Sequence, residues 1–381
     1  MKYIPRVAES TIKKYLTIFP VVGITGPRQS GKSTMLQKLF GGTYRYVSFD
    51  DLNNVALFHD DPKRFMRTYS EKVIFDEVQR VPEIFNAIKQ LVDEHRDVYG
   101  RFIVTGSSQF AFMKNVSESL AGRIGLLSLL PFQYSEIPNA LHNDSIFKGA
   151  YPELVTRKYE ASIDWYASYL DTYLTRDVRS LREIGSMRDF RRCLQLLASR
   201  TSQILNMSDI GRDIGVSTPT IRKWISVLEA SYILFLLPPH YKNYGKRVIK
   251  SPKVYFFDTG LVSFLTGIRN TELFEKGPMY GALFENYIVS EIVKKELHTK
   301  SDSEFFYCRT SNGVEVDLII DRKSQQEYIE IKSSETFRPE MTKAISQIKK
   351  KNQKGYLLYR GRGVDFTKDL EVLNYKKYLT G

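Results

Sequence analysis

The stretch that decides the fold is Gly26-Pro27-Arg28-Gln29-Ser30-Gly31-Lys32-Ser33-Thr34. It fits the pattern G-x-x-x-x-G-K-[ST] and lies between a short apolar run at residues 21–24 and a helical stretch that begins near Lys32. Glycines let the backbone turn its N–H groups toward phosphate oxygens, and the helix N-terminus adds partial positive charge. Lys32 would supply a charge for the β- and γ-phosphates and Ser33 a hydroxyl for Mg²⁺, with Thr34 following into the helix. We therefore expect residues 26–34 to bind ATP together with Mg²⁺.

Polar side chains also follow two later apolar runs. Residues 73–75 lead directly into Asp76 and Glu77, a pair suited to holding Mg²⁺ through Asp76 and orienting the attacking water through Glu77. Residues 102–104 lead to Ser107 and Ser108, and ligands bind at the carboxyl ends of strands in open α/β sheets. We expect Ser107 or Ser108 to contact the γ-phosphate or the water, the alternative being a plain Ser/Gly turn.

Arg123, in the segment 120–123, is a candidate arginine finger. A guanidinium can neutralise the charge that develops during phosphoryl transfer. The competing interpretation is an ordinary surface arginine. The sequence leaves open whether Arg123 would act within its own chain or on a neighbouring copy, so a homo-oligomer is compatible with it.

Composition sets the broad class of protein. The chain has 381 residues, of which 42% are hydrophobic and 26% charged, enough for an ordinary core in two or three domains. No run of about 18 uncharged apolar residues occurs, so we expect no membrane segment and a cytoplasmic location. Cys193 and Cys308 are isolated, which argues against a disulfide scaffold and against structural zinc.

The charge of the chain favours a polyanionic partner. The formal net charge is +13, and residues 176–258 alone carry 15 Lys or Arg against 7 Asp or Glu. This concentration predicts nucleic-acid binding by the middle of the chain. The alternatives are a solvated basic face and a surface between subunits.

Residues 208–230 have the layout of a helix-turn-helix motif, with a turn at 215–217 and Ser217 as the N-cap of the second helix. Apolar side chains at helical spacing form a core stripe. They are Ile221, Trp224, Ile225 and Leu228. The other face would present groups suited to phosphate and groove contacts, namely Thr218, Thr220, Arg222 and Lys223. A motif that serves only for packing is the alternative.

Near the C-terminus, charged residues occur in an order typical of restriction-like nucleases. Glu285 lies in a helical stretch, Glu315 and Asp317 open an apolar strand, and Glu330 and Lys332 end the next strand. Side chains two apart on a strand point to one face, so Glu285, Asp317 and Glu330 could hold Mg²⁺ while Lys332 stabilises charge. The alternatives are charged strand ends that contact DNA or another domain, and surface ion pairs.

The chain resembles prokaryotic AAA-type P-loop ATPases that carry a poorly characterised C-terminal domain. The resemblance covers nearly the whole chain and rests on residues 26–34, 75–79, 105–108 and 120–123 and on 130–132 followed by Glu136. It implies ATP hydrolysis, with roles at Lys32, Ser33, Asp76 and Glu77 as described above, Ser107 as a sensor and Arg123 as a finger.

The fold expected is α/β in three parts. Apolar runs alternate with helical stretches between residues 21 and 131, which predicts a parallel sheet in a P-loop ATPase domain at 1–140. The later segments resemble a winged helix, within a helical region at 141–265, and a restriction-endonuclease-like α/β domain at 266–381.

These features together predict a Mg²⁺-dependent ATPase whose hydrolysis is coupled to a nucleic-acid-binding C-terminal half, with DNA favoured over RNA. Two alternatives are an ATP-regulated DNA endonuclease and an ATP-dependent switch that binds a protein partner.

Overall fold

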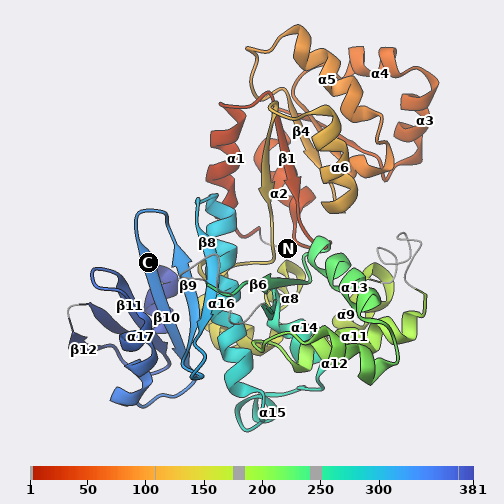
Figure 1. Cartoon of the computed structure of the whole chain (residues 1–381). Coiled ribbons are helices and arrows are strands. Elements are labelled where there is room, and N and C mark those ends of the chain that lie inside the picture. The colour runs from red at the N-terminus through yellow and green to blue at the C-terminus, as the bar shows by residue number, and fades with distance from the viewer. Residues whose placement is uncertain (1–2, 108, 175–184, 241–250, 368) are drawn as a thin grey trace. The chain divides into compact units, whose positions relative to one another are not determined.

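The computed structural model describes residues 3–107, 109–174, 185–240, 251–367 and 369–381 (Figure 1). The chain forms two compact units. The first comprises Met1–Phe132, Ala230–Tyr232 and Leu297–Lys300, and the second comprises Gln133–Glu229, Ile233–Glu296 and Ser301–Gly381. The predicted boundary at residue 265 falls inside the second unit, and the three-part division stays a prediction.

The first unit contains a five-stranded parallel sheet in the order β2-β3-β4-β1-β5. Its strands are β1 (Val21–Thr25), β2 (Arg45–Ser48), β3 (Val73–Asp76), β4 (Phe102–Thr105) and β5 (Ile124–Ser128). Its helices are α1 (Ala8–Leu16), α2 (Lys32–Phe40), α3 (Leu52–Asp60), α4 (Pro62–Thr68), η1 (Val78–Arg80), α5 (Ile84–Glu94) and α6 (Gln109–Ser119). Because all strands are parallel, their carboxyl ends meet at one edge.

Helices cover both faces of this sheet, as Figure 1 shows. On one face, α1 and α2 pack on side chains such as Val22 and Ile24. On the other, α3 to α6 enclose an aromatic cluster in which Phe49 and Phe75 stack at 5.9 Å. Burial on both faces explains why β1, β3 and β4 are almost continuously apolar.

The second unit begins with helices and a hairpin. The helical elements are η2 (Tyr134–Glu136), η3 (Asn139–Leu141), α7 (His142–Lys148), α8 (Pro152–Thr156), α9 (Ser162–Tyr169), the π-helical η4 (Leu170–Leu174), α11 (Met187–Ser199), α12 (Met207–Ile214), α13 (Thr218–Ala230), α14 (Thr259–Leu265) and α15 (Thr271–Glu275). The strands β6 (Leu234–Leu237) and β7 (Lys253–Phe256) form an antiparallel pair.

The rest of the second unit is a mixed six-stranded sheet in the order β12-β13-β11-β10-β9-β8. Its strands are β8 (Glu304–Arg309), β9 (Glu315–Asp321), β10 (Gln326–Lys332), β11 (Lys354–Tyr359), β12 (Val364–Thr367) and β13 (Leu370–Asn374). The accompanying helices are α16 (Tyr280–Thr299), η5 (Pro339–Thr342), α17 (Lys343–Ile348) and α18 (Tyr375–Thr380).

Main-chain groups of the β6–β7 hairpin form hydrogen bonds with residues of α16 and β8. The Asn286 side chain bonds both the N–H and the carbonyl of Phe256, each at 2.8 Å. The N–H of Tyr307 donates to the carbonyl of Pro238 at 3.0 Å, and its hydroxyl donates to the carbonyl of Ser251 at 2.7 Å. The hairpin is therefore part of the same compact unit as the six-stranded sheet.

Within the described part of the chain, none of the helices is both long and apolar enough to cross a membrane.

Candidate functional site

The phosphate-binding loop leaves β1 at a glycine that no other residue could replace without strain. Gly26 has φ of 142°, and a Cβ atom there would lie 2.1 Å from the carbonyl oxygen of Leu129. Gly31 has φ of 89° directly before α2. The two glycines therefore let the main chain turn back and enter the helix at Lys32.

Lys32 points into the loop. Its Nζ donates to the carbonyl oxygens of Gly26 and Pro27 at 2.9 Å each, and the residue is 5% exposed. This position places the ammonium group where the loop can present it to phosphate oxygens. Phosphate contacts of all the loop residues from Gly26 to Thr34, including Lys32, stay predictions.

Arg6 supports the loop from outside the motif. Its guanidinium donates to the carbonyl oxygens of Ser30 at 2.8 Å and Leu130 at 2.7 Å, and lies 4.8 Å from the ring centre of Phe132. Nothing in the local sequence around Arg6 indicates this role, because its partners lie 24 and 124 residues away.

Asp76 is the last residue of β3, and its carboxylate accepts hydrogen bonds from three hydroxyl groups. Ser33 Oγ donates to Asp76 Oδ2 at 2.8 Å, and Tyr46 and Thr105 also donate to this carboxylate. Burial, and next the hydrogen bond to Asp76, raise the pKa of Tyr46, so its hydroxyl keeps its proton. The hydroxyl of Ser33 beside a carboxylate oxygen fits Mg²⁺, which prefers one or two carboxylates completed by substrate phosphates and water.

Glu77 and Ser107 meet at the ends of neighbouring strands. Ser107 Oγ donates to Glu77 Oε2 at 3.0 Å, and Gln79 Nε2 contacts both residues. Glu77 has φ of 56°, a left-handed conformation that is uncommon outside glycine and clusters at functional sites. Ser107 is thus placed to orient Glu77, and Ser108 lies outside the described residues.

Arg123 lies away from this cluster. It directly precedes β5, and its carbonyl accepts from the N–H of Val21, the first residue of β1. The loop follows the last residue of β1, about 15 Å further along the strand. The Arg123 side chain pairs with Asp93 at 2.8 and 3.0 Å, which lowers the pKa of Asp93. A role for Arg123 within its own chain has no support here, and action on a second copy stays a prediction.

The helix-turn-helix layout appears at α12 and α13. Gly215 takes φ of 88° in the turn, and the predicted stripe of Ile221, Trp224, Ile225 and Leu228 is buried. Arg222 and Lys223 are exposed, whereas Thr218 and Thr220 are half-buried. The antiparallel β6–β7 pair follows α13 as a wing would, and the winged-helix identity stays a prediction.

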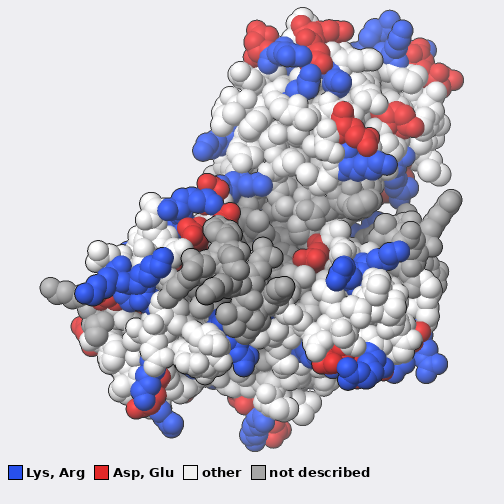
Figure 2. All heavy atoms as spheres, in the orientation of Figure 1, with Lys and Arg blue, Asp and Glu red and all other residues white. Residues whose placement is uncertain are grey.

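The basic excess of residues 176–258 is only partly described. Seven of its 15 cationic residues lie outside the described residues, namely Arg176, Arg179, Arg182, Lys242, Lys246, Arg247 and Lys250. On the face shown in Figure 2, Lys and Arg side chains are interspersed with Asp and Glu and form no single large patch.

The charged residues near the C-terminus come together around a cation that the sequence motif did not include. Lys253, at the start of β7, places Nζ 3.1 Å from Glu285 Oε1 and 3.7 Å from Asp317 Oδ1, and forms a close ion pair with Glu315. Lys253 is 2% exposed. We call Glu285, Glu315 and Asp317 the carboxylate cluster.

Glu330 and Lys332 lie beside this cluster. Lys332 Nζ is 2.5 Å from Glu330 Oε1, and Asp317 Oδ2 accepts from the N–H of Ile331 at 2.9 Å. Burial, and next the charge of Asp317, raise the pKa of Glu285 to about 7 and that of Glu330 to about 8.

The Mg²⁺ site expected at Glu285, Asp317 and Glu330 stays a prediction. In this structure the ammonium group of Lys253 lies beside two of these carboxylates. The ammonium group of Lys253 lies within ion-pair distance of one carboxylate oxygen from each residue of the carboxylate cluster. Among the described residues, no group of three or more His, Cys, Asp or Glu side chains is arranged to hold a metal ion. We therefore derive no metal-dependent step for this cluster.

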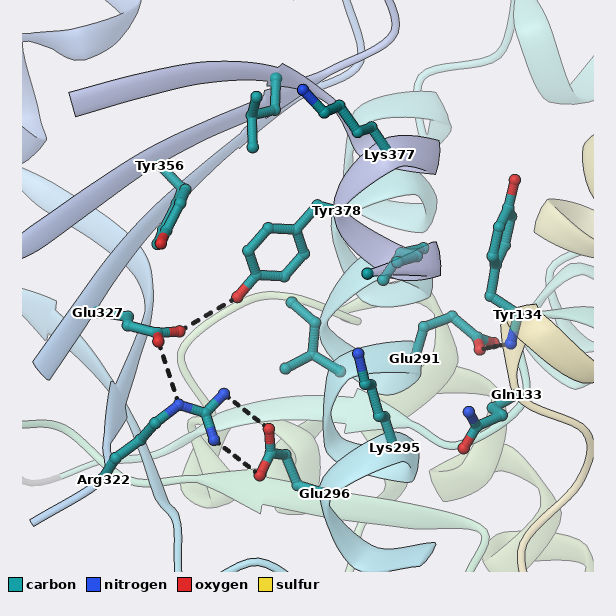
Figure 3. Close-up of a pocket in the computed structure, with 14 residues that line it drawn as sticks. Gln133, Tyr134, Glu291, Lys295, Glu296, Arg322, Glu327, Tyr356, Lys377 and Tyr378 are labelled. Atoms are coloured by element: carbon teal, nitrogen blue, oxygen red, sulfur yellow. Dashed lines mark hydrogen bonds and ion pairs between the residues drawn. The ribbon is translucent and has the colours of Figure 1, made fainter. Parts of the chain in front are cut away.

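A separate pocket of about 310 Å³ lies in the second unit (Figure 3). Arg322 lines this pocket and pairs with Glu296 at 2.7 Å and with Glu327 at 3.1 Å, and Tyr378 donates to Glu327. Hydrogen bonding to Glu296 and Glu327 raises the pKa of Arg322. None of the predicted site residues lines this pocket.

Comparison with known proteins divides the chain into three matched segments. A family described as "AAA domain" matches residues 19–138. Two families described as domains of unknown function match the remainder, DUF8612 at residues 139–272 and DUF4143 at residues 280–378. The sheet with the phosphate-binding loop therefore belongs to an AAA-type P-loop ATPase domain.

Relatives that match most of this chain show which family it belongs to. An uncharacterized protein of Mycobacterium tuberculosis is 31% identical over 334 residues, which cover 87% of this chain and 74% of that protein, and one of Mycobacterium bovis matches equally. The chain belongs to their family. An uncharacterized protein of Methanocaldococcus jannaschii, 25% identical over 78% of this chain and 71% of its own length, is similar to this family member.

Two solved structures show distant likenesses to this family member. The Walker-type ATPase PABY2304 of Pyrococcus abyssi covers 68% of this chain and 94% of its own, with 13% identity and a TM-score of 0.46. RuvB of Thermotoga maritima covers 61% of this chain and 86% of its own, with 14% identity and a TM-score of 0.27. Likenesses this weak carry no conclusion about function.

Proposed function

We propose that this protein is a Mg²⁺-dependent ATPase that converts ATP and water to ADP and phosphate. The contact of 2.8 Å between Ser33 Oγ and Asp76 Oδ2 carries the proposal. It joins the start of α2 to the end of β3 at the carboxyl edge of the sheet, directly after Lys32, whose ammonium group enters the loop. The AAA domain match over residues 19–138 supports the same activity.

In this proposal the chain binds ATP and Mg²⁺, orients the attacking water and accepts a proton from it. Lys32 and the loop N–H groups bind the β- and γ-phosphates, and Ser33 and Asp76 hold Mg²⁺. Bound Mg²⁺ neutralises charge on the phosphate oxygens. Glu77, oriented by Ser107, accepts a proton from water as the water oxygen bonds to the γ-phosphorus. The bond from that phosphorus to the bridging oxygen breaks, and ADP leaves with the bonding electrons.

The substitution Glu77→Gln tests this mechanism. Because the amide cannot accept the proton, we expect ATP hydrolysis to fall roughly 10²- to 10⁴-fold while ATP affinity stays near that of the parent. Steady-state phosphate release and equilibrium binding of ATP measure the two effects. The exposed Glu94→Gln is the matched control. Hydrolysis at the parental rate by Glu77→Gln would refute the role of Glu77.

We further propose that hydrolysis is coupled to nucleic-acid binding by the second unit, with DNA as the first candidate. Exposed Arg222 and Lys223 on α13, in a helix-turn-helix layout, support this proposal. Phosphate contacts release counterions, so DNA affinity must fall steeply with salt.

The double substitution Arg222→Ala and Lys223→Ala tests the DNA proposal. We expect weaker DNA binding at every salt concentration and a slope of log affinity against log salt reduced by about two. DNA should also change the ATPase rate of the parent but not that of the double variant. Lys13→Ala with Lys14→Ala, an exposed pair on α1, is the control. Equal slopes, or an ATPase rate that DNA leaves unchanged, would count against the coupling.

A further inference from the structure

The carboxylate cluster contains its own positive charge. Lys253 is 2% exposed, and its Nζ lies within ion-pair distance of carboxylate oxygens from three residues, which favours the charged ammonium form. A buried ammonium is tolerated only where opposite charges and hydrogen bonds compensate its lost hydration. Lys253 meets this condition, because it contacts Glu285, Glu315 and Asp317.

We propose that Lys253 is the resident cation of the carboxylate cluster and keeps divalent metal out of it. This inference concerns the second unit and does not depend on the proposed ATPase activity. It also assigns a role to a residue of the β6–β7 pair, next to the helix-turn-helix layout, within a cluster built from α16 and β9.

The main chain around Lys253 is fixed on both sides. Two residues before it, the carbonyl of Ser251 accepts from the hydroxyl of Tyr307 at 2.7 Å, and the Tyr307 ring centre lies 5.7 Å from Lys253 Nζ. Three residues after it, Phe256 is bonded through both main-chain groups to Asn286. These contacts hold the main chain at Lys253 next to the cluster that its ammonium group enters.

Removing the ammonium would leave a site that attracts a divalent cation. Glu285, Glu315 and Asp317 would then lie close together without an ammonium group among them, and a divalent cation would favour their ionised forms. Glu330 adds a nearby oxygen, since its Oε2 is buried and makes no hydrogen bond to any described residue. Hard oxygen ligands of this kind suit Mn²⁺ and Mg²⁺.

Mn²⁺ binding tests the proposal. Free Mn²⁺ would be followed by electron paramagnetic resonance during titration of the full chain without nucleotide. We compare the parent, Asp317→Asn, Lys253→Met, and Lys253→Met combined with Asp317→Asn. The parent and Asp317→Asn should bind Mn²⁺ alike, because Asp317 holds no metal in either. Lys253→Met should gain one site, at least about tenfold tighter than any in the parent, and the added Asp317→Asn should abolish it.

Two results would overturn the proposal. One is Mn²⁺ binding by the parent that Asp317→Asn removes. The other is a folded Lys253→Met, checked by circular dichroism, that gains no Asp317-dependent site. Lys253→Arg keeps the charge and should gain no site. If Lys253→Met does not fold, the parent and Asp317→Asn still decide the matter, since equal binding upholds the proposal and Asp317-dependent binding refutes it.

Discussion

At position 26 the phosphate-binding loop has room for glycine but not for a residue with a Cβ atom. A side chain there would meet the main-chain carbonyl of Leu129, which cannot move without disturbing the segment that follows β5. The φ of 142° adds a conformation that residues other than glycine rarely adopt. The geometry of the loop therefore requires glycine at this position.

The substitution Gly26→Ala should therefore destabilise the first unit. We expect a loss in the free energy of unfolding of at least about 1–3 kcal/mol from backbone strain, with further loss from the clash at Leu129. Urea unfolding would measure it. Gly42→Ala is the control, because a Cβ atom at Gly42 meets no atom within 4 Å. Equal midpoints for the two variants would contradict this account of the loop.

Residues within a contiguous motif could be placed from the sequence, whereas their distant partners could not. Lys32, Ser33 and Asp76 were named from local pattern, and the structure brings them to one edge of the sheet. Arg6 and Lys253 were missed, because each acts on groups that lie far along the chain. A buried lysine followed by an apolar strand offers no local sign that its charge is compensated.

At the scale of elements, strands buried on both faces were the easiest to predict. β1, β3 and β4 are fully buried and read as uninterrupted apolar runs. β5 was not predicted, since its residues alternate between buried and half-buried and include Gly125. β8, β12 and β13 were missed for a similar reason, as their sequences mix charged and apolar residues and only the sheet gives them partners.

Asn286 joins helix α16 to strand β7, two elements that lie far apart in the sequence. It bonds both main-chain groups of Phe256 and accepts from Thr201 at 2.5 Å, with all of its side chain buried. Asn286→Ala should lower the free energy of unfolding by about 2–4 kcal/mol, because two buried main-chain groups lose their hydrogen-bond partners. The exposed Asn143→Ala should change stability by less than about 0.5 kcal/mol. Chemical unfolding followed by circular dichroism compares them, and similar losses would refute the anchoring role.

At the scale of the molecule, the family member combines an ATPase unit with a larger second unit. The first contains most of the AAA domain match, and the second contains most of the two segments matched by families of unknown function. The sequence predicts three domains, and the contacts of β7 with α16, and of Pro238 after β6 with β8, show why a boundary near residue 265 is hard to place from pattern alone.

The most direct measurement is equilibrium binding and turnover of ATP with Mg²⁺ by the full chain and by Lys32→Ala. Loss of a charge-assisted contact should weaken ATP binding roughly 10- to 100-fold and reduce turnover at least as much. Lys38→Ala, an exposed lysine on the same helix, should behave as the parent. An absence of ATP binding by the parent, or parental binding and turnover by Lys32→Ala, would contradict the assignment of residues 26–34 as the ATP site.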